Sequence, residues 1–427
     1  MSHLMQCFAL VCGLIYSSSI FAADRGNQQT HHPDAAAQVQ LSEDLSTDRQ
    51  RSLVEYQALV SQLESEQGAY ANQLGEALLG MGLIYRSQGN HQLALDAFKR
   101  ALQISRINEG LHNLNQIKIL ELIIESNTAQ QAWHDLGENY HYLYWVNRRN
   151  YADDDARLLP IIERIGLWHV DAYHLNIYGS SVGHLVKADD LFDKAIDIAA
   201  NIDSGDYEQL VRSLYYTALI NYHIASDIND KFKTSHWDIR EAMIPNQRPT
   251  PYVNEIAVRQ FYFNQSYFKG KRAIQRILDI HAGNHPASVI EHAQALVFFG
   301  DYFLALRRKW DAMKRYEQAY NLLVDNGASI EDINKLFGEP VPLKTLTPPG
   351  GDELNIGQNN TYVDAVFDVP SNGWPSNIKI TETNPQDNPD MFKRGKLAIA
   401  GTHYRPRFEG GKPVPTSGVK LRYVFKQ

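Results

Sequence analysis

The sequence predicts a mainly α-helical protein, in which a solenoid of paired helices over residues 49–337 precedes a small α+β domain over residues 361–427. Three observations support this fold class. Amphipathic helical stretches follow one another through the first region, a Pro- and Gly-rich segment occupies residues 338–360, and strand-like alternation of apolar and polar residues appears only after it. Two folded domains joined by an extended, semi-rigid linker are therefore expected.

Length, composition and charge limit the functional classes. The chain has 427 residues, of which 44% are hydrophobic, so it can bury a large core and is too long for one compact domain. Its formal net charge of -8 supplies no basic field for phosphates, which argues against a nucleic-acid partner. From Met391 onward, however, cationic side chains outnumber acidic ones. These cations either meet an anionic partner or protect a solvated strand from edge pairing.

The N-terminal residues are expected to be an export signal. An apolar run extends from Cys7 to Tyr16 and is followed by FAAD, which is typical of a signal peptide over residues 1–23 that is cleaved after Ala22 or Ala23. The run is too short to span a membrane comfortably, although an uncleaved anchor is the alternative. Residues 24–48, rich in Gln, Asp, His, Ser and Ala, are expected to be a flexible linker with order starting near Arg49.

A repeated pattern of large and small residues appears twice in the helical region. The first copy is Leu78, Met81, Gly82, Tyr85, Ala94, Phe98 and Ala101, and the second is Leu296, Phe299, Gly300, Phe303, Ala312, Tyr316 and Ala319. Weaker copies include Ala188, Phe192 and Ala195, and then Ala273, Ile277 and Ile280. Small residues such as Gly82 are expected where two helices cross closely, with Phe98 filling the space beside them, and Gly89 is expected to end the first helix in a left-handed conformation.

This pattern resembles the tetratricopeptide repeat family. The resemblance implies an α-solenoid whose repeats stack into a continuous core. It also implies that the first helix of each repeat lines a surface that binds a protein partner. The corresponding positions in this sequence are Glu76, Leu79, Leu83, Arg86 and Ser87 in the first copy and Gln294, Val297, Asp301 and Leu304 in the second.

Residues 361–427 predict a hairpin, a helix and a last strand. Alternation places Val363, Ala365, Phe367 and Val369 on one strand face, Gly373 and Pro375 supply a turn, and Ile378 and Ile380 continue the return strand. MFKRGKLAIAGTHY is expected to be a helical stretch, and Val419, Leu421, Tyr423 and Phe425 alternate along a third strand. This order, with HYRPRFEGGKPVPTSGVKLRYVF, resembles the C-terminal domain of TonB-family proteins.

The TonB resemblance implies a periplasmic protein that binds partners in the cell envelope. An extended peptide would add to the exposed edge near Gly418–Phe425, contacting Val419, Leu421 and Tyr423, with Arg405 and Arg407 close by. A second possibility is an accessory factor of TonB-dependent outer-membrane transport that touches components of that system.

The sequence offers no established catalytic motif. His134 and His141 stand seven residues apart without an acidic partner in a zinc-like spacing, and Asp153, Asp154 and Asp155 are explained by a helix N-terminus. We therefore expect no enzyme activity, no cofactor and no metal site. A hydrolase is the third class considered, and it would need a polar catalytic cluster within the helical array.

Overall fold

The computed structural model of the protein describes residues 35–177, 181–202, 207–231, 255–283, 288–343, 361–386 and 388–424. The predicted signal peptide lies outside these residues, as do Phe425 and the part of the predicted linker from residue 344 to residue 360. The chain divides into two compact units, Met1–Gln57 and Ala58–Gln427, and both the helical array and the C-terminal sheet belong to the second unit.

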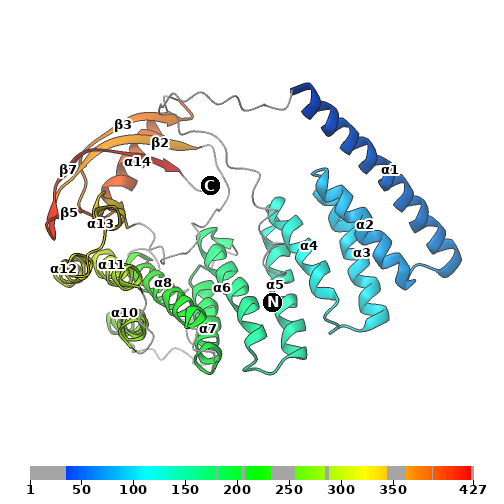
Figure 1. The fold of residues 1–427 in the computed structure, drawn as a ribbon, viewed down its shortest axis with the longest axis horizontal. Helices are drawn as coiled ribbons and strands as arrows, with labels where there is room; N and C mark the ends of the chain where they lie inside the picture. Colours follow the sequence, from blue (N-terminus) through cyan, green and yellow to red (C-terminus); the bar gives the residue numbers. More distant parts are fainter. Residues whose placement is uncertain are drawn as a thin grey trace. The chain divides into compact units, whose positions relative to one another are not determined.

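The described helices from α2 to α12 follow one another in chain order, each packing against the next (Figure 1). The helices are α1 (Ala35–Gln67), α2 (Asn72–Ser87), α3 (His91–Glu109), α4 (Gln116–Ala129), α5 (Trp133–Asn150), the short 3-10 helix η1 (Ala156–Leu158), α6 (Leu159–His174), α7 (Ser181–Ala200), α8 (Glu208–Lys231), α10 (Glu255–Ala282), α11 (Val289–Ala305), α12 (Lys309–Asp325) and α13 (Ile330–Phe337).

Helix α1 begins earlier than the sequence suggested. Its first residue, Ala35, lies within the predicted flexible linker and precedes the expected start of order near Arg49. The segment opens with three alanines, and alanine has the highest helix propensity of the amino acids. Local propensity therefore extends a helix into a stretch whose polar composition resembled a linker.

In several helix pairs, a glycine of one helix lies directly against an aromatic ring of the other, which lets the two helices approach closely. Gly82 of α2 lies so close to Phe98 of α3 that a side-chain Cβ would overlap the ring, and Gly300 of α11 faces Tyr316 of α12 in the same way. Gly166 repeats this contact with Phe192, at 2.7 Å between an added Cβ and the ring. The predicted close crossings in both sequence copies are confirmed.

Helix ends follow the chemistry of their flanking residues. Ser288 accepts a hydrogen bond from the Glu291 amide while the Glu291 carboxylate accepts one from the Ser288 amide, which is a complete capping box for α11. Gly89, which follows the C-cap residue of α2, has φ +76°, as its predicted left-handed role requires. Asp155 accepts from the Arg157 amide at 2.9 Å and caps η1, so the acidic run does mark a helix start.

The C-terminal residues form a three-stranded antiparallel sheet in the order β3-β2-β7, with α14 packed on β3 and β2 (Figure 1). The elements are β1 (Val341–Pro342), β2 (Tyr362–Val369), β3 (Ser376–Asn384), α14 (Pro389–Ala400), β4 (Tyr404–Arg405), β5 (Arg407–Glu409), β6 (Lys412–Val414) and β7 (Thr416–Val424). The predicted order of hairpin, helix and last strand is therefore present. Along β2, every second side chain is buried, which matches the predicted alternation.

The apolar core of the helical array extends into the junction with the C-terminal domain, whose sheet has smaller apolar clusters of its own. A continuous cluster of buried side chains runs from α6 to α13 and includes Leu343, after β1, and Phe408 of β5. Strand β1 pairs with β4, so the first residues of the predicted linker are bound to the C-terminal domain instead of extending between two separate bodies. Among the described helices, none combines the length and the apolar character needed to cross a membrane.

Candidate protein-binding surfaces

The predicted binding face of the first repeat is partly accessible. Glu76 is exposed and Leu83 is 39% exposed on α2, whereas Leu79 is half-buried. Arg86 pairs with Glu125 of α4, and the Ser87 hydroxyl donates to the Ile84 carbonyl at 2.8 Å. This face therefore offers a mixture of apolar and charged groups, with Arg86 already engaged by a later helix.

The corresponding face of α11 is not a surface, which corrects the prediction for Val297, Asp301 and Leu304. Val297 is 4% exposed and Leu304 is 1% exposed, and both belong to the continuous core, while Gln294 is half-buried. At Asp301 and Leu304 the C-terminal domain contacts this face, through Arg405 and His403, whereas Val297 packs within the core cluster. Sequence periodicity locates an apolar or mixed face, but it does not reveal what packs on it.

Asp301 and Arg405 form a buried ion pair between the array and the C-terminal domain. The Arg405 guanidinium donates to the Asp301 carboxylate at 2.8 Å, and the Tyr316 hydroxyl donates to the other carboxylate oxygen at 2.7 Å. The Arg405 and Asp301 side chains are only 7% and 13% exposed. Burial raises the pKa of the Asp301 carboxyl, and the Arg405 charge opposes that shift.

Further contacts fix the junction between the two regions. The Phe408 ring lies 5.4 Å from the Tyr316 ring and 5.2 Å from the Phe337 ring, in edge-to-face arrangements. Nδ1 of His403 lies 3.1 Å from the Leu304 carbonyl, and the His403 ring stacks on Trp374. Arg405 is therefore a structural residue instead of a partner contact, and Arg407 is half-buried and paired with Glu409 at 2.6 Å.

The predicted strand edge is present at β7. In the described part of the chain, β7 is hydrogen-bonded to β2 alone, so its other main-chain edge is not covered by a strand. Val419, Leu421 and Tyr423 are half-buried and pack on the apolar face of the sheet. They anchor the strand on that face, while Lys420 and Arg422 alternate with them on the exposed face.

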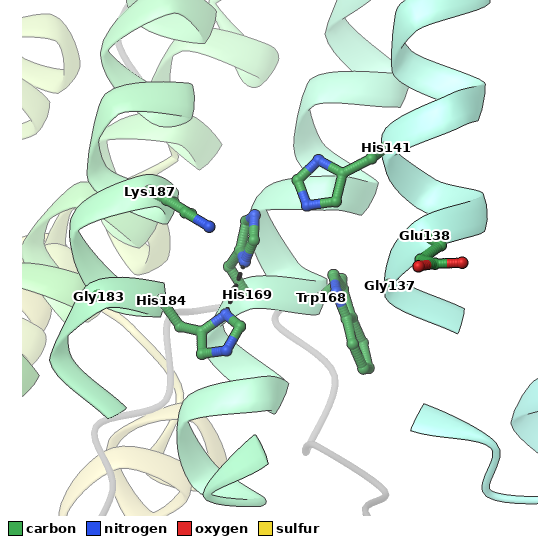
Figure 2. A pocket seen from close by; sticks show the side chains of 8 residues that line it. All are labelled: Gly137, Glu138, His141, Trp168, His169, Gly183, His184 and Lys187. Carbon is green, nitrogen blue, oxygen red and sulfur yellow. Dashed lines mark hydrogen bonds between the residues drawn. The ribbon is translucent and has the colours of Figure 1, made fainter. Parts of the chain in front are cut away.

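A pocket between α5, α6 and α7 that contains three histidines was not predicted. It has a volume of about 330 Å³ and is lined by Gly137, Glu138, His141, Trp168, His169, Gly183, His184 and Lys187. Figure 2 shows the His141 ring and the Lys187 side chain directed toward His169. Nδ1 of His169 lies 2.9 Å from Nδ1 of His184, and the rings of His141 and His169 have centroids 5.3 Å apart.

The histidines of this pocket resist protonation. Burial lowers the pKa of His169 to about 3, with further lowering by the charges of His141, His184 and Lys187. The pKa values of His141 and His184 are also lowered, first by burial and then by Lys187. At neutral pH the rings are therefore uncharged, and one of the two facing Nδ1 atoms carries the proton that it donates to the other.

The sequence drew attention to only one residue of this pocket, His141. His141 was considered with His134 because they lie on one helix, whereas its spatial neighbours come from two later helices. His134 instead lies 3.7 Å from Glu138 on the surface of α5. In the described residues, no group of three or more His, Cys, Asp or Glu side chains is arranged to hold a metal ion.

The tetratricopeptide repeat family matches the chain at residues 75–108, which comprise most of α2 and nearly all of α3. This match identifies a tetratricopeptide unit in the array, and helical repeats of this kind provide surfaces for protein–protein interaction.

Solved structures also resemble the chain. One, a Podosopora anserina protein designated a kinesin light chain with nearly identical TPR-like repeats, is 10% identical, covers 60% of this chain and 98% of its own, and has a TM-score of 0.38. Another, BtubC (BKLC) from P. vanneervenii, is 10% identical, covers 67% of this chain and 92% of its own, and has a TM-score of 0.36. No curated protein matches the sequence.

Proposed function

We propose that this protein is an exported periplasmic scaffold for protein–protein interaction, in which the helical repeats bind one protein and the TonB-like C-terminal domain binds an extended peptide along β7. The observation that carries the peptide site is the main-chain edge of β7 that no described strand covers. This nine-residue strand is paired on one side with β2. An added strand satisfies these main-chain groups and gains affinity from them.

The surroundings of β7 suit a peptide site. Lys420 and Arg422 place positive charge on the strand, and the Arg422 guanidinium is held by the Asp364 carboxylate at 2.6 Å. Such charges limit edge-to-edge pairing between copies of the protein and favour peptides with acidic side chains. The junction at Asp301 and Arg405 keeps the sheet attached to the last repeats, so a peptide and a protein partner would be held on one support.

Export and the TonB-like assignment rest on the sequence. The apolar run before FAAD supports a signal peptide, and the succession β2, β3, α14, β7 agrees with the order that the resemblance implies. A periplasmic location also suits a mature chain without cysteine, since Cys7 and Cys12 both precede the expected cleavage site.

Strand addition is tested with peptides selected on the full chain from a random display library. Each peptide is synthesised with single N-methyl groups on successive main-chain amides, which remove one hydrogen-bond donor at a time. Because alternate amides of an added strand face the neighbouring strand, affinity should fall about tenfold or more at every second position and little at those between.

Amide hydrogen exchange of the protein locates the edge in the same samples. Peptide binding should protect β7 amides and leave β3 amides unchanged. Loss of affinity without a two-residue period, or protection confined to the helices, would contradict strand addition at β7.

A further inference from the structure

The pocket between α5, α6 and α7 is lined by titratable nitrogen-bearing side chains from each of its helices. His141 comes from α5, His169 from α6, and His184 and Lys187 from α7. His169 is 1% exposed and His184 is 9% exposed, whereas His141 and Lys187 lie on the surface at the entrance. The buried pair is held by its Nδ1 contact, so the ring of His169 is fixed between His184 and His141.

These groups favour an anion over a cation. Lys187 can only donate hydrogen bonds, and its ammonium group repels any metal ion at the neighbouring rings. The 2.9 Å separation of the two Nδ1 atoms is a hydrogen-bond distance, so these atoms are used by one another instead of facing a common ligand. His184 also has a hydrogen bond with the Ile177 backbone, and a neutral imidazole carries only one N–H. The Lys187 ammonium group, together with the second ring N–H that protonation adds to His141 and His169, is suited to the oxygens of a carboxylate, sulfate or phosphate.

The affinity of this pocket for an anion should increase as the pH falls. The charges that act on His169 are those of His141 on α5 and of His184 and Lys187 on α7, and Glu138 of α5 lines the same pocket. Arg164 and Asp171 of α6 act on Tyr140, which stacks on Trp168 of the pocket. From α8, His223 contacts His174 and Tyr173. Glu138 is the acidic group that lines the pocket, and its side chain is 72% exposed at the rim.

Protonation of the imidazole rings adds positive charges that repel one another and the Lys187 ammonium group. A bound anion would offset this repulsion. By linkage, an anion that favours the charged rings raises their proton affinity, and protonation raises the affinity for the anion by the same factor.

We propose that this pocket is a binding site for an oxyanion, held by Lys187, His141 and His169, whose affinity rises as the pH falls. The oxyanion can be a free inorganic anion or a carboxylate carried by a protein partner, and the chemistry of recognition is the same for both. The site is separate from the β7 edge, so its test does not depend on strand addition.

Sulfate is the most suitable probe because its charge does not change over the mildly acidic to neutral range in which the titrations are made. The full chain, labelled with ¹⁵N in histidine, is titrated with sodium sulfate at constant ionic strength maintained with chloride, and the imidazole signals are followed. We expect saturable shifts of the pocket histidines and an affinity that rises by up to about tenfold per pH unit for each proton taken up with the anion.

Three exposed substitutions separate this site from nonspecific charge effects. Lys187→Gln removes the ammonium group and should lower sulfate affinity by about tenfold or more, since a charge-assisted hydrogen bond is lost. Lys194→Gln, two helical turns further along α7 and also exposed, should leave affinity unchanged. Glu138→Gln removes the acidic group at the rim and should raise affinity.

A glutamate tripeptide blocked at both ends serves as the carboxylate probe in parallel. Tighter binding of this peptide than of sulfate would indicate a partner's side chain, and the reverse order would indicate a free anion. Shifts that do not saturate, equal sulfate affinity in Lys187→Gln and Lys194→Gln, or an affinity that is constant or falls toward acid pH would overturn the proposal.

Discussion

Gly75 and Gly82 lie two turns apart on α2, and only Gly75 has room for a side chain. A Cβ at Gly82 would overlap the Phe98 ring, whereas a Cβ at Gly75 would meet Ile104 at an ordinary contact distance of 3.5 Å. Gly82→Ala should therefore destabilise the protein by about 1–3 kcal/mol through overpacking. Gly75→Ala should stabilise it by about 0.5–1 kcal/mol, because alanine loses less backbone entropy in a helix.

Urea unfolding of the two variants, followed by circular dichroism, measures this difference. Equal free energies of unfolding for both variants would show that the helices do not cross at Gly82. The requirement at Gly82 was predictable from sequence because the small residue and its aromatic partner recur at the same spacing in a second copy, at Gly300 and Tyr316.

His169 should make stability depend on pH. Its pKa is lowered from 6.5 to about 3, so the folded state binds this proton less well than the unfolded state does. The free energy of unfolding is therefore highest, as far as His169 is concerned, above pH 6.5. It falls as the pH drops toward 3, by up to about 1.4 kcal/mol per pH unit. His169→Phe, which keeps an aromatic ring in the core, should reduce the slope of unfolding free energy against pH in this window.

The measurement is a series of urea unfolding curves at pH values from about neutral down into that window, in a chloride solution without sulfate, phosphate or carboxylate. A slope that is the same in His169→Phe and in the unsubstituted protein would show that His169 is not buried in its neutral form. The histidine pocket itself was not predictable, because helical periodicity within α5, α6 and α7 does not reveal the rotation and register of the helices relative to one another.

At the level of elements, the contact between α11 and β4 decides how the array ends. Asp301→Ala would leave the Arg405 guanidinium buried without its carboxylate partner, which should cost about 3–5 kcal/mol. The double substitution Asp301→Leu with Arg405→Met removes both charges and should be much less harmful, with an effect from neutral to stabilising. Unfolding curves of the two variants provide the comparison.

If the double substitution is as harmful as Asp301→Ala alone, the pair does not act through charge compensation. This contact was not predictable from the sequence. Both residues were predicted to contact partners, Asp301 because it occupies a first-helix position of the second repeat copy and Arg405 because it was expected to lie close to the edge of the last strand. They bind one another, across 104 residues of chain, and neither residue's local context indicates the other.

The C-terminal strands were easier to predict than their surroundings. Alternation along β2 and β7 was sufficient to identify both strands and their inner faces, because a strand places every second side chain on the same side. The pairing of β1 with β4 was not predictable, since a two-residue strand in a Pro-rich segment carries no periodic signal. The burial of Phe408 among Tyr316 and Phe337 likewise depends on tertiary packing.

For the whole molecule, the second unit is a helical array that ends in a β-sheet domain, with a strand edge that no described strand covers. The tetratricopeptide match at residues 75–108 supports protein binding by the array, and the proposed peptide site adds a second surface at β7. Phe408 and Leu343 pack on the apolar core at the end of the array. They take the place of a capping repeat, which repeat arrays otherwise need at their ends.

The most direct test of the proposed scaffold is photo-crosslinking in cells that express the full chain. A photoreactive amino acid is placed at Lys420, exposed on β7, or at Lys379, exposed on β3, the opposite edge strand of the same sheet. A peptide site at β7 predicts crosslinked protein adducts from Lys420 in the periplasmic fraction, and none from Lys379. Equal adducts from both positions, or recovery of the protein only from the cytoplasm, would contradict it.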